Sequence, residues 1–351
     1  MRRSEDPAEL LSVASAAGSA SAGRRALARL LSLVEQGGAP ARLVGKLTYE
    51  KAGSAYSVGL TGAPGAGKST LTGRLVGQAL DQNAGRVAVL AIDPSSPLSG
   101  GAILGDRVRM QEHGLDANVY IRSMASRGHL GGLAAAVPDA VRLFDACGWP
   151  LVLVETVGVG QVEVEVAGTC DTVVVVLNPG WGDAVQANKA GLLEVADVLV
   201  INKADRPGVR ETRRDLEHML QLSGELEWTP PIVETVASSG EGLTDLYGAI
   251  SSHRRHLEEG GGLARRRQAR LAEEMERLVA DASSQLVAGI LGRLPAHQAG
   301  IPPSEVDSAL EAGRELLGRL AERELDPASG AEELGRIAAR LSLAGERSPS
   351  P

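Results

Sequence analysis

A glycine-rich stretch at 62–70 constrains the fold of this 351-residue chain more than any other feature, because it fits the pattern G-x-x-x-x-G-K-[ST]. Residues 56–60 before it read as a short strand, and residues 71–76 after it read as the start of a helix. A loop in this setting turns its peptide N–H groups toward phosphate oxygens, and the helix N-terminus adds a partial positive charge. The sequence therefore predicts a nucleotide phosphate site formed by Gly62, Ala63, Pro64, Gly65, Ala66, Gly67, Lys68, Ser69 and Thr70.

Two side chains of this loop have predicted chemical roles. The ammonium group of Lys68 can reach the β- and γ-phosphates, and the hydroxyl of Ser69 can bind Mg²⁺. The alternative is a glycine-rich turn that matches the pattern by chance. The strand and helix on either side of the loop weigh against it.

From residue 56 onward, apolar runs rich in β-branched residues alternate with helical stretches. This alternation is typical of a mostly parallel sheet with helices on both faces. We therefore predict an α/β domain of the P-loop class over 51–258, flanked by helices on either side. The expected strands are 56–61, 87–92, 118–121, 151–156, 172–177, 197–201 and 231–236.

An N-terminal helical extension is expected over 1–50, where Leu27, Leu30, Leu31 and Val34 follow helical spacing. A C-terminal helical region is expected over 259–344, with helices around 305–324 and 331–342 after a first long one, and a disordered tail over 345–351. The first helix carries an apolar stripe that suits either a subdomain with its own core or a dimerisation arm. The stripe consists of Leu271, Met275, Leu278, Ala282 and Leu286.

Composition excludes several classes of protein. A formal net charge of −8 provides no broad basic surface for nucleic acid. The two cysteines, Cys147 and Cys170, do not form a C-x-x-C pair, so neither a disulfide framework nor a zinc site is expected. No apolar run approaches the roughly 18 residues of a membrane span, and no secretion signal is evident. A cytoplasmic protein is expected.

The sequence N-K-A-D at 202–205 selects the base. A carboxylate at Asp205 can accept hydrogen bonds from the N1–H and the exocyclic amine of guanine, which adenine cannot offer there. Lys203 is expected along the base plane, and Asn202 is expected to tie this loop to the phosphate loop. A second guanine loop, with a peptide N–H for the O6 atom, is expected at Ala237, Ser238 and Ser239. GTP and GDP are therefore the predicted ligands.

Three carboxylates are candidates for the magnesium site beside Ser69. Asp93 ends one expected strand, Glu155 ends another, and Asp106 lies in a glycine-rich segment that suits a nucleotide switch. Gly158 lies three residues after Glu155, where its N–H can sense the γ-phosphate. These residues predict a Mg²⁺-dependent nucleotide site.

No built-in group that positions the hydrolytic water is obvious. Gln161 is one candidate for this role. An equal alternative is that Gln161 is an ordinary polar residue at the start of a helix. Arg107, Arg109, Arg122 and Arg127 can supply positive charge, although structural roles suit them better. We expect slow GTP hydrolysis by the chain alone.

Four motifs together are highly specific: D-P-S-S-P at 93–97, G-G-A-I-L-G-D-R at 100–107, R-S-M-A-S-R-G at 122–128 and E-T-V-G-V-G-Q at 155–161. With these motifs the chain resembles, over roughly 24–345, the MeaB/ArgK/MMAA family of G-protein chaperones for adenosylcobalamin-dependent acyl-CoA mutases. The resemblance implies a GTPase that gates adenosylcobalamin delivery to methylmalonyl-CoA mutase or a relative and protects that enzyme. It also implies a homodimer formed through the C-terminal helical arm.

The resemblance further implies a switch segment at 178–189 that contacts the mutase. Gln186 and Lys189 are the residues implied to assist hydrolysis when the partner binds, alongside Lys68, Asp106 and Glu155. The chain departs from the family pattern at Trp181, where a small residue is usual, and at His129, where a threonine is usual.

Two other functions remain open on the residues alone. A P-loop kinase of a small molecule or transport protein would use the same phosphate loop, but N-K-x-D disfavours ATP. A nickel-insertion GTPase would share the architecture, but the six histidines are scattered and form no Cys-His cluster.

Overall fold

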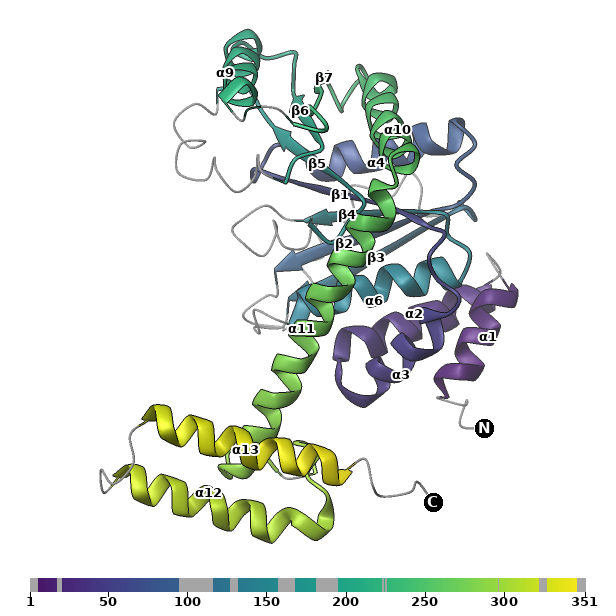
Figure 1. Ribbon diagram of the computed structural model, residues 1–351. Coiled ribbons are helices and arrows are strands. Elements are labelled where there is room, and N and C mark those ends of the chain that lie inside the picture. Colours follow the sequence, from purple (N-terminus) through teal and green to yellow (C-terminus); the bar gives the residue numbers. More distant parts are fainter. Residues whose placement is uncertain are drawn as a thin grey trace. The chain divides into compact units, whose positions relative to one another are not determined.

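The computed structural model describes residues 6–17, 21–94, 116–126, 132–156, 168–180, 195–222, 224, 226–295, 297–321 and 327–345 (Figure 1). The chain forms two compact units, Met1–Arg267 and Gln268–Pro351. Among the described residues, no helix is long and apolar enough to cross a membrane.

A seven-stranded sheet with the order β3-β2-β4-β1-β5-β6-β7 forms the centre of the first unit. Every pair of neighbouring strands is parallel. The α/β fold predicted from the alternating pattern is therefore confirmed. The strands are β1 Tyr56–Gly62, β2 Val87–Pro94, β3 Val119–Ser126, β4 Leu151–Thr156, β5 Thr172–Leu177, β6 Val198–Asn202 and β7 Ile232–Thr235.

The central strands are apolar on both sides because helices cover both faces of the sheet (Figure 1). On one face, α4 (Lys68–Asp81) and α10 (Leu243–Glu259) pack on a cluster that includes Val58 and Leu60. On the other face, α6 (Gly132–Ala146) packs on a cluster that includes Val152. The helix α9 (Val209–Leu222) covers β5 and β6.

The N-terminal helices α1 (Pro7–Ala17), α2 (Ser21–Gln36) and α3 (Gly38–Tyr49) share the core of α6. Few aromatic side chains are available, and three of them gather here, where Tyr120 contacts Phe144 and Trp149 edge to face at 5.6 and 5.7 Å between ring centroids. Arg122 on β3 forms an ion pair with Glu35 of α2 at 2.9 Å. This arginine, a candidate for charge compensation at the phosphates, therefore fastens α2 to the sheet.

The second unit contains most of α11 (Gly262–Ile290), the short 3₁₀ helix η2 (Pro303–Glu305), α12 (Val306–Ala321) and α13 (Pro327–Gly345). Its core includes Leu286, Ile290, Ile301 and Leu341. Earlier in α11, four large apolar side chains are exposed by 40 to 66%: Leu271, Met275, Leu278 and Val279. Only the last part of the expected stripe is therefore buried within the chain.

Two arginines near the start of α11, Arg266 and Arg267, form ion pairs within the first unit. Arg267 binds Asp171, which precedes β5, and Arg266 binds Asp197, which precedes β6, both at 2.7 Å. The two carboxylates are 2% and 7% exposed. Asp171 also accepts a hydrogen bond from the peptide N–H of Ser57. These ion pairs therefore hold the amino ends of β5 and β6.

Replacing Asp171 with alanine leaves the Arg267 guanidinium and the Ser57 N–H without their carboxylate. We expect the variant Asp171→Ala to lower the free energy of unfolding by about 3 kcal/mol, because breaking a mostly buried ion pair leaves a charge uncompensated. Urea unfolding of the full chain measures this change. Glu258→Gln is the control, since its exposed ion pair with Arg254 contributes less than about 1 kcal/mol. Equal losses of unfolding free energy in the two variants would show that the Asp171–Arg267 ion pair stabilises the fold no more than an exposed pair does.

Candidate nucleotide site

The phosphate loop follows β1, which lies between β4 and β5 in the sheet. The carboxyl ends of parallel strands near such a central crossing are the usual place for ligands in this class of sheet. Gly67 has φ of 92°, in the left-handed region that favours glycine. A Cβ atom there would lie 2.5 Å from the Nδ2 atom of Asn202. The loop therefore needs glycine so that Asn202 can approach its backbone.

Lys68 is the first residue of α4 and is 6% exposed. Its Nζ atom donates hydrogen bonds to the carbonyl oxygens of Gly62 at 2.9 Å and Ala63 at 2.8 Å. These two contacts hold the ammonium group against the first residues of the loop. A positive charge fixed in this position suits phosphate oxygens.

Ser69 and Glu155 meet beside the loop although 86 residues separate them. The Oγ atom of Ser69 donates a 2.5 Å hydrogen bond to Oε1 of Glu155, and both residues are buried. A hydroxyl and a carboxylate are oxygen donors of the kind that Mg²⁺ takes. The described residues contain no cluster of three or more His, Cys, Asp or Glu that could hold a metal. The side chain of Asp93 and all of Asp106 lie outside the described part of the chain.

The buried side chain of Asn202, at the end of β6, joins the phosphate loop to the loop after β7. Its Nδ2 atom donates to the carbonyl oxygen of Ala66 at 2.7 Å. Its Oδ1 atom accepts hydrogen bonds from the Thr235 hydroxyl and the Ala237 N–H, both at 3.1 Å. Lys203, with φ of 61°, donates to the carbonyl oxygen of Gly65. Hydrogen bonds thus join the phosphate loop to the N-K-A-D sequence at 202–205. Asp205, the last residue of that sequence, is exposed.

The loop after β7 is closed by its own hydrogen bonds. The N–H groups of Ser239 and Gly240 both donate to the carbonyl oxygen of Val236, at 3.1 and 2.9 Å. The Ala237 N–H is held by Asn202. Within the described part of the chain, the N–H of Ser238 has no acceptor. Of Ala237, Ser238 and Ser239, the three residues that the sequence suggests for the guanine O6 contact, Ser238 is the one whose N–H lacks an acceptor among the described residues.

Sequence reasoning missed two polar side chains of this region. Thr235 supports Asn202, and the Glu-Thr sequence at the end of the last expected strand was a weak signal for it. Arg74 of α4 donates to the carbonyl oxygens of Ala237 and Ser238. An arginine inside a helix carries no sequence mark that would reveal such contacts.

The remaining candidates lie outside the described residues. They are Gly158, Gln161, Gln186, Lys189, Arg107, Arg109 and Arg127, and the departures at His129 and Trp181 lie there too.

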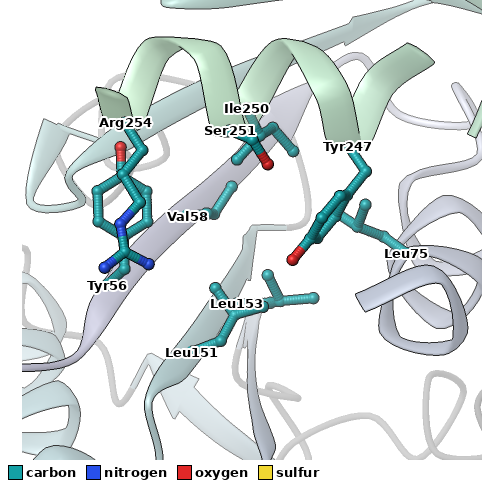
Figure 2. A pocket seen from close by; sticks show the side chains of 9 residues that line it. All are labelled: Tyr56, Val58, Leu75, Leu151, Leu153, Tyr247, Ile250, Ser251 and Arg254. Carbon is teal, nitrogen blue, oxygen red and sulfur yellow. The ribbon is translucent and has the colours of Figure 1, made fainter. Parts of the chain in front are cut away.

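A separate pocket lies beneath α10, at the opposite end of β1 from the phosphate loop. Figure 2 shows Tyr247, Ser251 and Arg254 of α10 near residues of β1 and β4. The Arg254 guanidinium lies 4.8 Å from the centroid of the Tyr56 ring. The pocket is mostly apolar and contains none of the nucleotide-site residues. Its lining consists of Tyr56, Val58, Leu75, Leu151, Leu153, Tyr247, Ile250, Ser251 and Arg254.

Comparisons with known proteins identify the family to which the chain belongs. A protein of Pyrococcus horikoshii that is named as a GTPase is 44% identical over 313 residues, which cover 88% of this chain and 92% of that protein. The GTPase ArgK of Escherichia coli is 38% identical over 227 residues, 63% of this chain and 68% of ArgK. The mouse mitochondrial methylmalonic aciduria type A homolog is 40% identical over 219 residues, 61% of this chain and 52% of the homolog.

Among solved structures, one described as a LAO/AO transport system kinase is similar, with a TM-score of 0.64 and 25% identity. The match covers 96% of this chain and 99% of that one. The family model described as methylmalonyl Co-A mutase-associated GTPase MeaB matches residues 27–290. The chain is therefore a GTP hydrolase and belongs to the MeaB family of GTPases.

Proposed function

We propose that this GTPase is a nucleotide-dependent regulator of an adenosylcobalamin-dependent acyl-CoA mutase, methylmalonyl-CoA mutase or a relative. It gates adenosylcobalamin loading and protects the mutase from inactivation. The observation that carries the nucleotide part is the pair of hydrogen bonds by which Asn202 donates to the phosphate loop and accepts from the loop after β7. Family membership supports the choice of mutase as partner.

In the proposed complex, residues 62–70 bind the phosphates of GTP or GDP, and Asp205 accepts hydrogen bonds from guanine. Ser69 and Glu155 hold Mg²⁺ together with Asp93 and Asp106. A Mg²⁺ ion held by these residues would supply positive charge that offsets the negative charge developing on the phosphate oxygens during hydrolysis. The Ser69–Glu155 hydrogen bond supports this assignment because it brings two oxygen donors to the edge of the phosphate loop.

Hydrolysis in this proposal is slow until the mutase binds. The segment that carries Gln186 and Lys189 then assists the attack of water on the γ-phosphate. The protein acts in the reducing cytoplasm, which suits its two buried cysteine thiols, Cys147 and Cys170.

The C-terminal region, 259–344, is proposed as the dimerisation arm, beside an N-terminal extension over 1–50 and a GTPase domain over 51–258. The exposed side chains Leu271, Met275 and Leu278 recur at steps of four and three, so they share one face of α11. A second copy of the chain would remove this apolar face from water.

The base preference tests the guanine assignment. Wild-type protein is expected to bind GDP and to bind ADP much more weakly. Asp205→Asn is expected to lower the affinity for GDP by roughly 100-fold and to improve binding of XDP, because the new amide can donate to the C2 carbonyl of xanthine. Calorimetric titration measures both. Asp245→Asn, at an exposed acid of α10, is the control. Unchanged GDP affinity in the Asp205 variant would sink the assignment.

The regulator proposal predicts a response to the partner. GTP turnover is expected to rise by about tenfold or more when purified acyl-CoA mutase is added, because the partner completes the hydrolytic site. Phosphate release measures the rate. Lys68→Ala with the same mutase shows how much of the rate comes from contaminating enzymes. Flat rates across methylmalonyl-CoA mutase and its relatives would remove the chaperone function while leaving the GTPase intact.

The arm proposal predicts a dimer that depends on α11. Combining Met275→Glu with Leu278→Glu places charges on the apolar face, so the molar mass in solution is expected to halve. Light scattering after size-exclusion chromatography measures this mass. Glu273→Gln, at an exposed position of the same helix, should leave the dimer intact. A dimer that survives the double substitution would rule out this face.

A further inference from the structure

We propose that Arg74 is a positioning residue for guanine recognition. It orients the peptide between Ala237 and Ser238 so that the Ser238 N–H is directed at the base. The inference rests on the proposed function only in that the loop after β7 receives guanine.

The contacts of Arg74 give this residue two fixed points on the loop. Its Nε atom donates to the carbonyl oxygen of Ala237 at 3.3 Å, and its Nη2 atom donates to that of Ser238 at 3.2 Å. A guanidinium group is planar, and its N–H donors point in fixed directions. Two bonds from one such group therefore restrain the orientation of the loop as well as its distance from α4.

This orientation determines where the Ser238 N–H points. The carbonyl of Ala237 and the N–H of Ser238 belong to the same peptide unit, and in a trans peptide they point in opposite directions. The described residues contain no cis peptide bond. With the oxygen turned toward Arg74, the N–H is directed away from it. A cationic donor on the carbonyl also polarises the amide, which strengthens the N–H as a donor.

Both backbone polar groups of Ala237, in the loop after β7, are therefore hydrogen-bonded to side chains. Asn202 accepts the Ala237 N–H, and Arg74 donates to the Ala237 carbonyl. Arg74 lies on the helix that begins with Lys68 and Ser69. One rigid helix thus carries the residues for the phosphates and the residue that aims the base contact. Base recognition is coupled to the position of the phosphate loop through α4.

The test compares full-length wild-type protein with Arg74→Met, using three nucleotides. GDP and IDP carry the O6 atom, and 2-aminopurine riboside diphosphate lacks it. We expect Arg74→Met to lower the affinities for GDP and IDP by about tenfold, which corresponds to the loss of one well-directed hydrogen bond. The affinity for the 2-aminopurine nucleotide is expected to change by less than about twofold. The 2-aminopurine base also lacks N1–H, but this difference affects wild type and variant alike. Arg74→Lys, which can restore one of the two contacts, should recover part of the loss.

Gln78→Met, one turn further along α4, is the matched control and should leave all three affinities unchanged. Equal weakening of the three ligands by Arg74→Met would show that Arg74 merely supports the helix, and no weakening would show that its contacts are immaterial. Either result overturns the inference. A wild-type protein that binds GDP and the 2-aminopurine nucleotide equally would instead refute the guanine loop itself. Melting temperatures establish that each variant is folded.

Discussion

The nucleotide site depends on the hydrogen bonds that the buried amide group of Asn202 makes. Its three hydrogen bonds reach the phosphate loop through Ala66, the end of β7 through Thr235 and the following loop through Ala237. An amide that is 1% exposed must keep its partners, because each unsatisfied polar atom in the interior costs about 1–3 kcal/mol. The absence of a side chain at Gly67 gives the amide room. These hydrogen bonds therefore hold the phosphate loop and the loop after β7 in a common geometry.

The two edges of the sheet at which the strands begin and end have different functions. At the carboxyl ends of the strands, Asn202 and Glu155 organise the phosphate and base loops. At the opposite edge, Asp171 and Asp197 bind the paired arginines that start α11. Because β6 runs from the residue after Asp197 to Asn202, one short strand connects the root of α11 to the nucleotide site.

The repeating apolar pattern was enough to predict the parallel sheet, since strands buried on both faces leave a clear signal. The strand β3 extends past the predicted end at residue 121 and pairs with β2 as far as Ser126, because the polar pair Arg122 and Ser123 interrupts the apolar run without ending the strand. Arg267 pairs with Asp171, which lies 96 residues away in the sequence. Local patterns do not encode such pairs, and Arg74 went unnoticed for the same reason.

A crystal structure of the full chain with GDP and Mg²⁺ tests the central claim most directly, namely that the loops joined by Asn202 form a single guanine nucleotide site. The base is expected between Asp205 and the Ser238 N–H, each within about 3 Å, with the diphosphate along the N–H groups of 62–70 and Mg²⁺ beside Ser69. A base bound away from Asp205 and Ser238, or a diphosphate outside the phosphate loop, would contradict it.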